Sequence, residues 1–219
     1  MTTHPYILTS EIYLCMMIGV DNLIAKSLRS IIQDNLSEQT VKKLDNRLVE
    51  KYGITIHQSV EDFQKLDDIL REFFGEGAVG IERKIFDSIC TVSKVKNTEE
   101  EWMTIRDSNI SKTVLEAFGD EDKKKIMNLL MNEPYVISEV LGMCNLPQTS
   151  GYRKINNMIS DGLLTVEGHI TTTDGKMVNK YVSVFENIKI DIVKNVVTVK
   201  VKLKTNSVKN SLMMPLIRN

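Results

Sequence analysis

A turn between two short amphipathic segments, at Asn145 to Pro147, constrains the fold more than any other feature of this sequence. The segments on either side of it, residues 137–144 and 148–160, both have the apolar spacing of a helix. Two short helices joined by a turn of about three or four residues form a helix-turn-helix, and the second of them enters the major groove of DNA. The sequence therefore predicts a helix-turn-helix whose recognition helix is residues 148–160.

Two alternating segments follow this pair of helices. Residues 163–167 and 177–185 alternate between apolar and polar side chains as half-buried strands do, and an Asp-Gly hairpin turn separates them. A recognition helix followed directly by a β-hairpin is typical of a winged helix. We therefore expect a winged helix-turn-helix over residues 109–186, with the wing at residues 168–180.

The outward side chains of the recognition helix and the wing are of the types that contact DNA. Arginine can fork onto guanine and asparagine onto adenine, while serine or threonine can hold a phosphate at a helix N-terminus. We therefore expect double-stranded DNA as the partner and a sequence-specific transcriptional regulator as the function. The expected DNA-binding residues are Thr149, Ser150, Tyr152, Arg153, Lys154, Asn157, His169, Lys176 and Lys180.

The charge distribution leaves a second function open. The chain has a net charge of −1, and residues 120–186 carry 7 basic against 9 acidic residues. A DNA-binding module is usually basic. Because winged helices also serve as protein-contact modules, the alternative function is an adaptor that contacts the transcription machinery.

Residues 1–95 have the pattern of an α-helical bundle. Apolar residues recur at helical spacing in segments 11–32, 37–52, 59–73 and 81–90. We expect this part to act as a sensor or dimerisation domain, which leaves room for an unknown small-molecule or protein effector.

A homodimer is the expected oligomer. A single winged helix covers few base pairs, and symmetric DNA sites need two subunits about one helical turn apart. The stripe in residues 11–32 is apolar enough to pair with itself, and burial within its own bundle fits it equally well.

Two further segments flank the winged helix. Residues 96–108 are polar and predict a linker, in which residues 102–105 form a short strand or an anchor that docks on the next domain. The alternation in residues 187–205 predicts a β-hairpin that extends the winged-helix sheet, and residues 206–219 are expected to be a flexible tail. The predicted fold class is mainly α with a small β component: an N-terminal α-helical bundle, a winged helix-turn-helix and a C-terminal β-hairpin extension.

A row of lysines follows one face of this last hairpin. Lys200, Lys202 and Lys204 alternate with apolar residues, and residues 187–219 carry 7 basic residues against 1 acidic. Such lysines either protect a strand edge against aggregation or contact phosphates along DNA.

No pattern in the chain indicates an enzyme. The chain lacks HExxH and GxSxG, and the GxGxxG at residues 75–80 lies between helices with no strand before it. The three cysteines, Cys15, Cys90 and Cys144, are scattered in apolar stretches, as buried thiols in a reducing cytoplasm are. We expect no cofactor and no metal, and a helical-domain enzyme of unknown chemistry is the third hypothesis.

The location is expected to be cytoplasmic. The most apolar stretch near the start, residues 12–20, is shorter than the roughly 20 residues of a membrane span. No basic region precedes it, so a signal peptide is not expected.

Several segments also carry a resemblance to known families. In the second half they are 115–126 (LEAFGDEDKKKI), 147–155 (PQTSGYRKI), 161–164 (DGLL) and 174–176 (DGK), with Tyr181. Together these resemble archaeal ArsR-like winged-helix regulators, which implies DNA binding. In the first half they are 17–20 (MIGV), 25–29 (AKSLR), 50–53 (EKYG) and 70–75 (LREFFG). These are similar to the Nitrosopumilus output domain, a helical domain of ammonia-oxidising archaea, and imply little chemistry.

Overall fold

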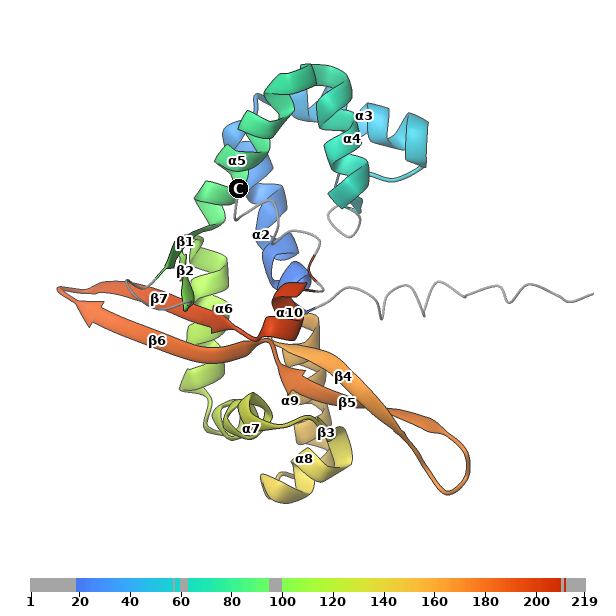
Figure 1. Ribbon diagram of the computed structural model, residues 1–219, viewed down its shortest axis with the longest axis vertical. Helices are drawn as coiled ribbons and strands as arrows, with labels where there is room; N and C mark the ends of the chain where they lie inside the picture. Colours follow the sequence, from blue (N-terminus) through green and yellow to red (C-terminus); the bar gives the residue numbers. More distant parts are fainter. Residues whose placement is uncertain (1–18, 57, 60–62, 95–99, 210, 212–219) are drawn as a thin grey trace, which may run out of the picture.

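Helices and antiparallel strands share this chain. The computed structural model describes residues 19–56, 58–59, 63–94, 100–209 and 211 (Figure 1). Of these residues, 59% are helical and 24% lie in strands, so the fold is mixed α/β. The β part is larger than the small component that the sequence predicts. Among the described residues, no helix combines the length and the apolar character that a membrane crossing requires.

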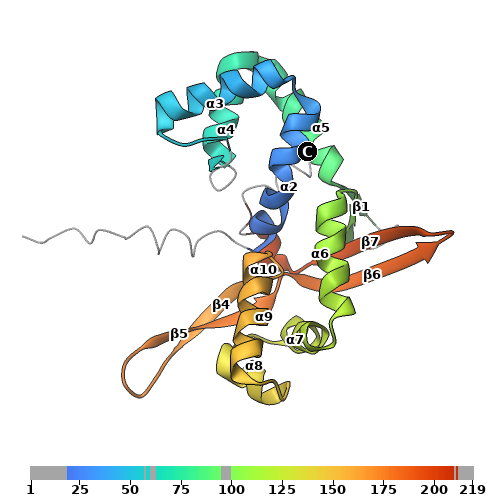
Figure 2. The ribbon, with the colours of Figure 1, turned by 180° about the vertical axis from the view of Figure 1, so that it is seen from behind.

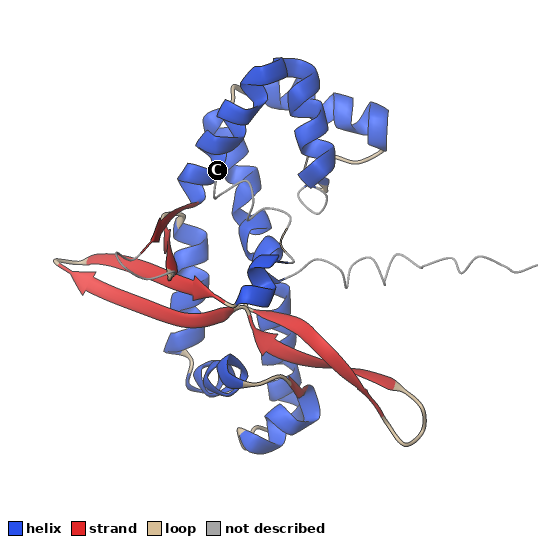
Figure 3. Cartoon of the chain, in the orientation of Figure 1, coloured by secondary structure: helices blue, strands red, loops and turns tan. Residues whose placement is uncertain are grey.

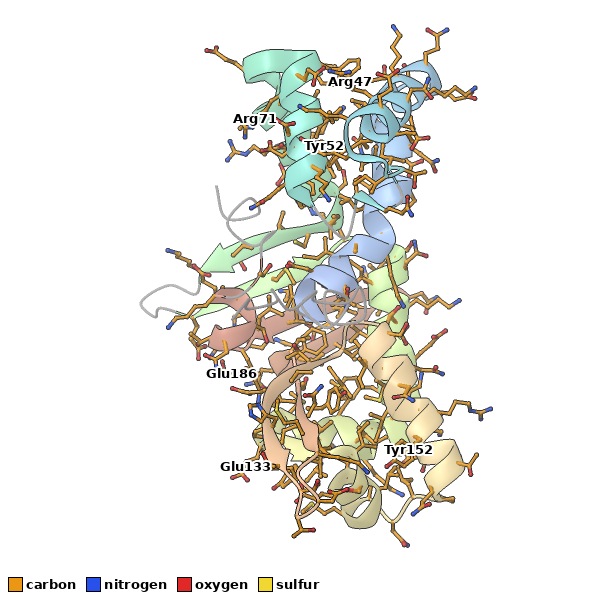
Figure 4. The ribbon with its side chains drawn as sticks, turned by 90° about the vertical axis from the view of Figure 1, so that its right-hand side faces the viewer. Arg47, Tyr52, Arg71, Glu133, Tyr152 and Glu186 are labelled. Atoms are coloured by element: carbon orange, nitrogen blue, oxygen red, sulfur yellow. The ribbon has the colours of Figure 1, made fainter. Side chains whose placement is uncertain are left out.

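The N-terminal part of the described chain is helical, as predicted (Figure 3). Its elements are α2 (Gly19–Asn35), α3 (Glu38–Tyr52), α4 (Phe63–Phe74), the 3-10 helix η2 (Gly75–Gly77) and α5 (Ala78–Ile89). Ser37 accepts a hydrogen bond from the Thr40 N–H at 3.2 Å, and Gly53 ends α3 with a left-handed φ of 67°. Ion pairs tie α3 to α4, including Arg47 Nε to Glu72 Oε1 at 2.7 Å (Figure 4).

A four-stranded antiparallel sheet joins the middle of the chain to its C-terminal part. Its strands, in spatial order, are β1 (Cys90–Lys94), β2 (Glu101–Ile105), β7 (Val196–Leu203) and β6 (Phe185–Val193). The short strand expected at 102–105 is therefore present as β2, whereas β1 has no counterpart in the prediction. Lys194 and Asn195 form the turn between β6 and β7, with left-handed φ values of 48° and 63°. The predicted C-terminal hairpin is confirmed.

The prediction that this hairpin extends the winged-helix sheet is wrong. β7 pairs instead with β2, with Ile105 opposite Val199 and Met103 opposite Val201. All four of these side chains are at most 6% exposed. The hairpin docks on the segment expected to be a linker because its apolar face completes a hydrophobic core there.

The segment for which the sequence predicts a winged helix has its elements in the expected order. They are α6 (Ser108–Gly119), α7 (Glu121–Asn132), β3 (Tyr135–Val136), α8 (Ile137–Met143), α9 (Gln148–Ser160), β4 (Leu164–Thr171) and β5 (Met177–Ser183). The three strands form a second antiparallel sheet in the order β3-β5-β4. Figure 2, which shows the molecule from behind, has α9 next to α8 and the β4–β5 hairpin projecting from the body.

One hydrophobic core runs through the helical part and the second sheet, and α2 connects them. Leu23, Ile24 and Leu28 of α2 are at most 2% exposed, and α2 packs against α5, α6 and β4. This part of the predicted stripe is covered by its own chain and is therefore unsuited to pairing with a second copy. Residues 11–18 of the stripe lie outside the described residues.

The start of the predicted flexible tail, residues 206–219, packs on the helical part. Helix α10 (Thr205–Lys209) contacts α2, and Ser207 and Ser211 are buried. The Ser211 hydroxyl donates a hydrogen bond to Asp21 of α2, whose side chain is itself buried. A buried carboxylate needs such a donor, which gives this segment a reason to pack. Residues 210 and 212–219 lie outside the described part of the chain.

Candidate nucleic-acid interface

One face of α9 is exposed along the length of the helix. Ile155 and Met158 on the opposite face are fully buried, in agreement with the apolar spacing of residues 148–160. The spacing of the exposed residues follows the helical repeat, so they share one continuous surface. This surface carries Thr149, Tyr152, Arg153, Asn156 and Asn157.

A close contact between α8 and α9 fixes how that face is presented. Gly151 on α9 lies against α8, and a Cβ on it would be 2.3 Å from Leu141 Cδ2. Asn145, in the turn between the two helices, has a left-handed φ of 52°. Asparagine tolerates this conformation better than most residues do. The tight turn and the small side chain together hold the two helices at short range.

Lys154, which the sequence predicts as a DNA-binding residue, is held within the protein. Its Nζ lies 2.7 Å from both carboxylate oxygens of Asp120 and 2.9 Å from Asp122 Oδ2. These carboxylates raise the pKa of Lys154, and Lys154 in turn is the main cause of a lowered pKa of Asp120. The ion pair fastens α9 to the start of α7, so Lys154 positions the helix.

The two hydroxyl residues at the start of α9 have different settings. Ser150 is half-buried, and its hydroxyl donates to the Pro147 carbonyl oxygen at 3.3 Å. Thr149 is exposed. Thr149 is therefore the better placed of the two predicted phosphate contacts, because a phosphate at a helix N-terminus needs an accessible donor.

A groove separates α9 from the wing, and Tyr152 stands in its wall (Figure 4). The groove has a volume of about 270 Å³ and lies between α8, α9 and β5. Met177, Val178, Asn179 and Tyr181 of β5 line the side opposite Tyr152. Tyr152 is 42% exposed and Met177 is 67% exposed, so both can contact a bound partner.

The wing presents its predicted residues on two different faces. His169 of β4 pairs directly with Asn179 of β5, so both lie on the face that borders the groove. Successive side chains of a strand point to opposite faces, and Lys180 therefore lies on the other face. Strand alternation therefore places His169 on the side of Tyr152 and Lys180 on the opposite side, and neither residue lines the groove itself.

Lys176 sits at the tip of the wing. Its side chain is 80% exposed, and its Nζ lies 3.0 Å from Asp174 Oδ2. The Thr172 N–H donates to the Lys176 carbonyl oxygen at 2.8 Å, and Gly175 takes a left-handed φ of 80° to close the turn. A surface ion pair of this kind is weak and exchangeable, so Lys176 remains available to a phosphate.

No protein-family model, curated protein or solved structure matches this chain.

The candidate interface therefore consists of the exposed face of α9 together with the groove side of the wing. Within the described part of the chain, no three His, Cys, Asp or Glu side chains gather where they could hold a metal ion.

Two residues of the candidate interface were missed by the sequence analysis, Asn179 on the wing and Asp120 as the anchor of Lys154. Side chains alternate between the two faces of a strand, so Asn179 lies on the same face as Tyr181, and this alternation could have identified it. Lys180 stands out in the sequence by its charge alone.

Proposed function

We propose that residues 109–186 form a winged helix-turn-helix that binds double-stranded DNA, with α9 as the recognition helix and β4–β5 as the wing. The order of elements supports this proposal, as does the sheet order β3-β5-β4, in which the short strand before the helix pair joins the hairpin after it. As a DNA-binding regulator the protein would act in the cytoplasm. The resemblance to archaeal ArsR-like regulators agrees with this proposal and stays a prediction.

The observation that carries the proposal is the continuous polar face of α9. Arg153, Asn156 and Asn157 are exposed on it and are of the types that read base edges in the major groove. Lys154 holds the helix in place through Asp120, so the reading side chains start from a fixed backbone. Thr149 at the start of α9 is our candidate for a phosphate contact.

The proposed interface has few cations. Arg153 on α9 and Lys176 at the wing tip are its exposed basic side chains, and His169 is exposed on the wing. Each phosphate contact contributes roughly 0.9 to the slope of log K against log salt. We therefore expect a shallow slope of about two per subunit. Affinity would then depend more on base contacts than on phosphates.

A comparison of two single variants tests the proposal. A binding site is first selected from random duplexes with the full chain, and affinities are then measured by fluorescence anisotropy. Arg153→Ala should weaken the selected site by roughly 1–3 kcal/mol while leaving random duplexes nearly unchanged. Lys180→Ala is the matched control, because it removes a wing cation from the opposite face and should change both affinities little. Absence of any selected site, or equal affinities of wild type and Arg153→Ala for it, would refute the proposal.

A protein-contact adaptor is the second candidate function. It is favoured by the apolar character of the groove rim, where Tyr152 and Met177 are exposed, and by Met143 on α8, which is 59% exposed. Aromatic and methionine side chains are enriched in protein interfaces. In this case no DNA site is selected, and Tyr152→Ala weakens binding to a protein component of the transcription machinery.

A further inference from the structure

The outer strand β6 of the first sheet presents an unusual combination of features. It is the last strand in the order β1-β2-β7-β6, and within the described residues it pairs with β7 alone. The hairpin tip projects beyond α6 (Figure 1). Four β-branched apolar residues at this tip are from 43% to 68% exposed: Ile192, Val193, Val196 and Val197. Soluble proteins usually protect such an edge, because its unpaired backbone groups template further strand pairing.

The turn determines which backbone groups of β6 face outward. In a two-residue hairpin of this type, the residues that flank the turn, Val193 and Val196, form a hydrogen-bonded pair. The direction of the backbone groups alternates along a strand. The N–H and C=O groups of Ile192, Ile190 and Ile188 therefore point away from β7, toward the outer edge.

This alternation limits how a second copy of β6 can pair with the edge. In an antiparallel pair of two β6 strands, a residue whose N–H and C=O groups point to the outer edge must lie opposite another such residue. This rule allows a two-fold axis through a residue of β6 but not between two residues. Three such candidates are Ile190 and its two neighbours, Lys189 and Asp191. An axis through Lys189 would place two lysines opposite each other, and an axis through Asp191 would do the same with two aspartates. Like charges directly opposite destabilise a strand pair.

The axis through Ile190 makes the segment self-complementary. Ile190 then lies opposite Ile190 of the partner subunit, and Ile188 lies opposite Ile192 of the partner subunit. Lys189 comes opposite Asp191 of the partner subunit, and the symmetry repeats this pair. Within its own sheet Lys189 has Lys200 as its cross-strand neighbour, and its Nζ lies 3.9 Å from Asp191 Oδ2 of the same chain. The partner's Asp191 adds a second carboxylate beside these two lysines.

We propose that the protein forms a symmetric dimer in which the β6 strands of two copies pair antiparallel about Ile190. The two four-stranded sheets then become one continuous sheet. The exposed Ile192 of each subunit gains an apolar neighbour, the partner's Ile188, which packs on the partner's own core. Such an interface uses the same patch on both subunits and closes on itself. This proposal does not depend on the proposed DNA binding.

The interface is small, because each subunit contributes mainly the seven residues from Asn187 to Val193. We therefore expect a dissociation constant on the order of micromolar. Sedimentation equilibrium of the full wild-type chain at about 1 to 100 µM should show a monomer–dimer equilibrium. A purely monomeric mass over this range overturns the proposal.

Charge reversal provides the specific test. Lys189→Asp places two pairs of aspartates across the axis, and Asp191→Lys places two pairs of lysines there. Each variant alone should dimerise at least about tenfold more weakly than wild type, since two attractive pairs become repulsive. An equimolar mixture of the two variants restores both Lys–Asp pairs, so it should form a heterodimer with an affinity near that of wild type.

The mixture also distinguishes pairing through β6 from a dimer that forms through another surface. The side chains of Lys189 and Asp191 are exposed, so circular dichroism should show that each variant keeps its fold. Single variants that dimerise as strongly as wild type would place the dimer interface elsewhere and overturn the proposal. A mixture of the two variants that stays monomeric would overturn it as well. If a different protein chain occupies this edge, wild type stays monomeric and the proposal fails.

Discussion

Lys154 donates to both carboxylate oxygens of Asp120, at 2.7 Å each, and so fastens α9 to the start of α7. The same Asp120 carboxylate accepts the N–H groups of Asp122 and Lys123 and caps α7. One carboxylate therefore satisfies the end of one helix and the cation of another. The lysine beside Arg153 in the sequence thus differs from it in role, because Lys154 is a positioning residue.

Replacing Lys154 by Met should lower the free energy of unfolding by about 0.5–1.5 kcal/mol, the range of a partly exposed ion pair with good geometry. The same substitution at Arg153, which is exposed, should change it by less than about 0.5 kcal/mol. Urea denaturation at pH 7 measures both. An equal decrease in the free energy of unfolding for the two variants would contradict the positioning role of Lys154.

The pH dependence provides a second readout of the same pair. Lys154 is the main cause of the lowered pKa of Asp120. A carboxyl whose folded pKa lies below its unfolded value stabilises the fold above the unfolded pKa, and this contribution is lost as the pH falls through the folded pKa. The stability difference between wild type and Lys154→Met should therefore shrink at acidic pH.

Gly162→Ala should destabilise the fold strongly. Gly162 has a φ of 75°, and a Cβ would lie 2.4 Å from the Gly19 carbonyl oxygen and from the Leu23 nitrogen. Left-handed strain costs about 1 kcal/mol, and displacing the α2 backbone should add at least about 2 kcal/mol. Gly175→Ala is the matched control, since it has a similar φ of 80° with nothing within 4 Å. Similar unfolding midpoints for the two variants would contradict this prediction, because they would mean that the α2 backbone moves away from the added Cβ at little cost in free energy.

Glu82→Gln should stabilise the protein near pH 8. Glu82 is 3% exposed, and burial, followed by the neighbouring Asp67, raises the pKa of its carboxyl to about 8. The folded state therefore holds the proton more tightly than the unfolded state, whose pKa is near 4.5. The contribution of Glu82 to the stability of the fold is therefore fully present below about pH 4.5, and it is lost as the pH rises toward about 8.

Glutamine keeps the shape of the side chain and cannot ionise, so the variant should gain about 1–3 kcal/mol over wild type at pH 8 and little at pH 4.5. Thermal denaturation across this range measures the difference. Glu76→Gln, on the exposed η2, is the matched control for the loss of one carboxylate. A constant difference at every pH would mean that Glu82 does not titrate in this window.

The row of Lys200 and Lys202 on β7 and Lys204 just after it should contribute little to DNA binding. Lys202 Nζ lies 2.9 Å from Glu100 Oε1 and 2.9 Å from Glu186 Oε1, and Lys204 is half-buried. We expect glutamine at positions 200, 202 and 204 to leave the salt dependence of DNA binding unchanged. If these lysines contact phosphates, the slope should fall by up to about three ion equivalents. Anisotropy titrations at several salt concentrations decide between the two.

The sequence by itself determined those features that depend on neighbouring residues. Ser37 and Gly53 mark the ends of α3, and the buried positions Ile155 and Met158 of α9 follow from helical spacing. The hairpin around Asn195 follows from strand alternation and a local turn. Backbone dihedral preferences and side-chain periodicity act over a few residues, so these signals can be read without the rest of the chain.

Tertiary structure alone decided which surfaces meet. Lys154 contacts Asp120, thirty-four residues away, which removes it from the residues that we propose to read DNA. The β6–β7 hairpin pairs with β2 near Met103 and not with the β3-β5-β4 sheet, although its alternation of apolar and polar residues would suit either sheet. Many pairings satisfy the same local pattern, and the burial of apolar surface across the whole chain selects among them.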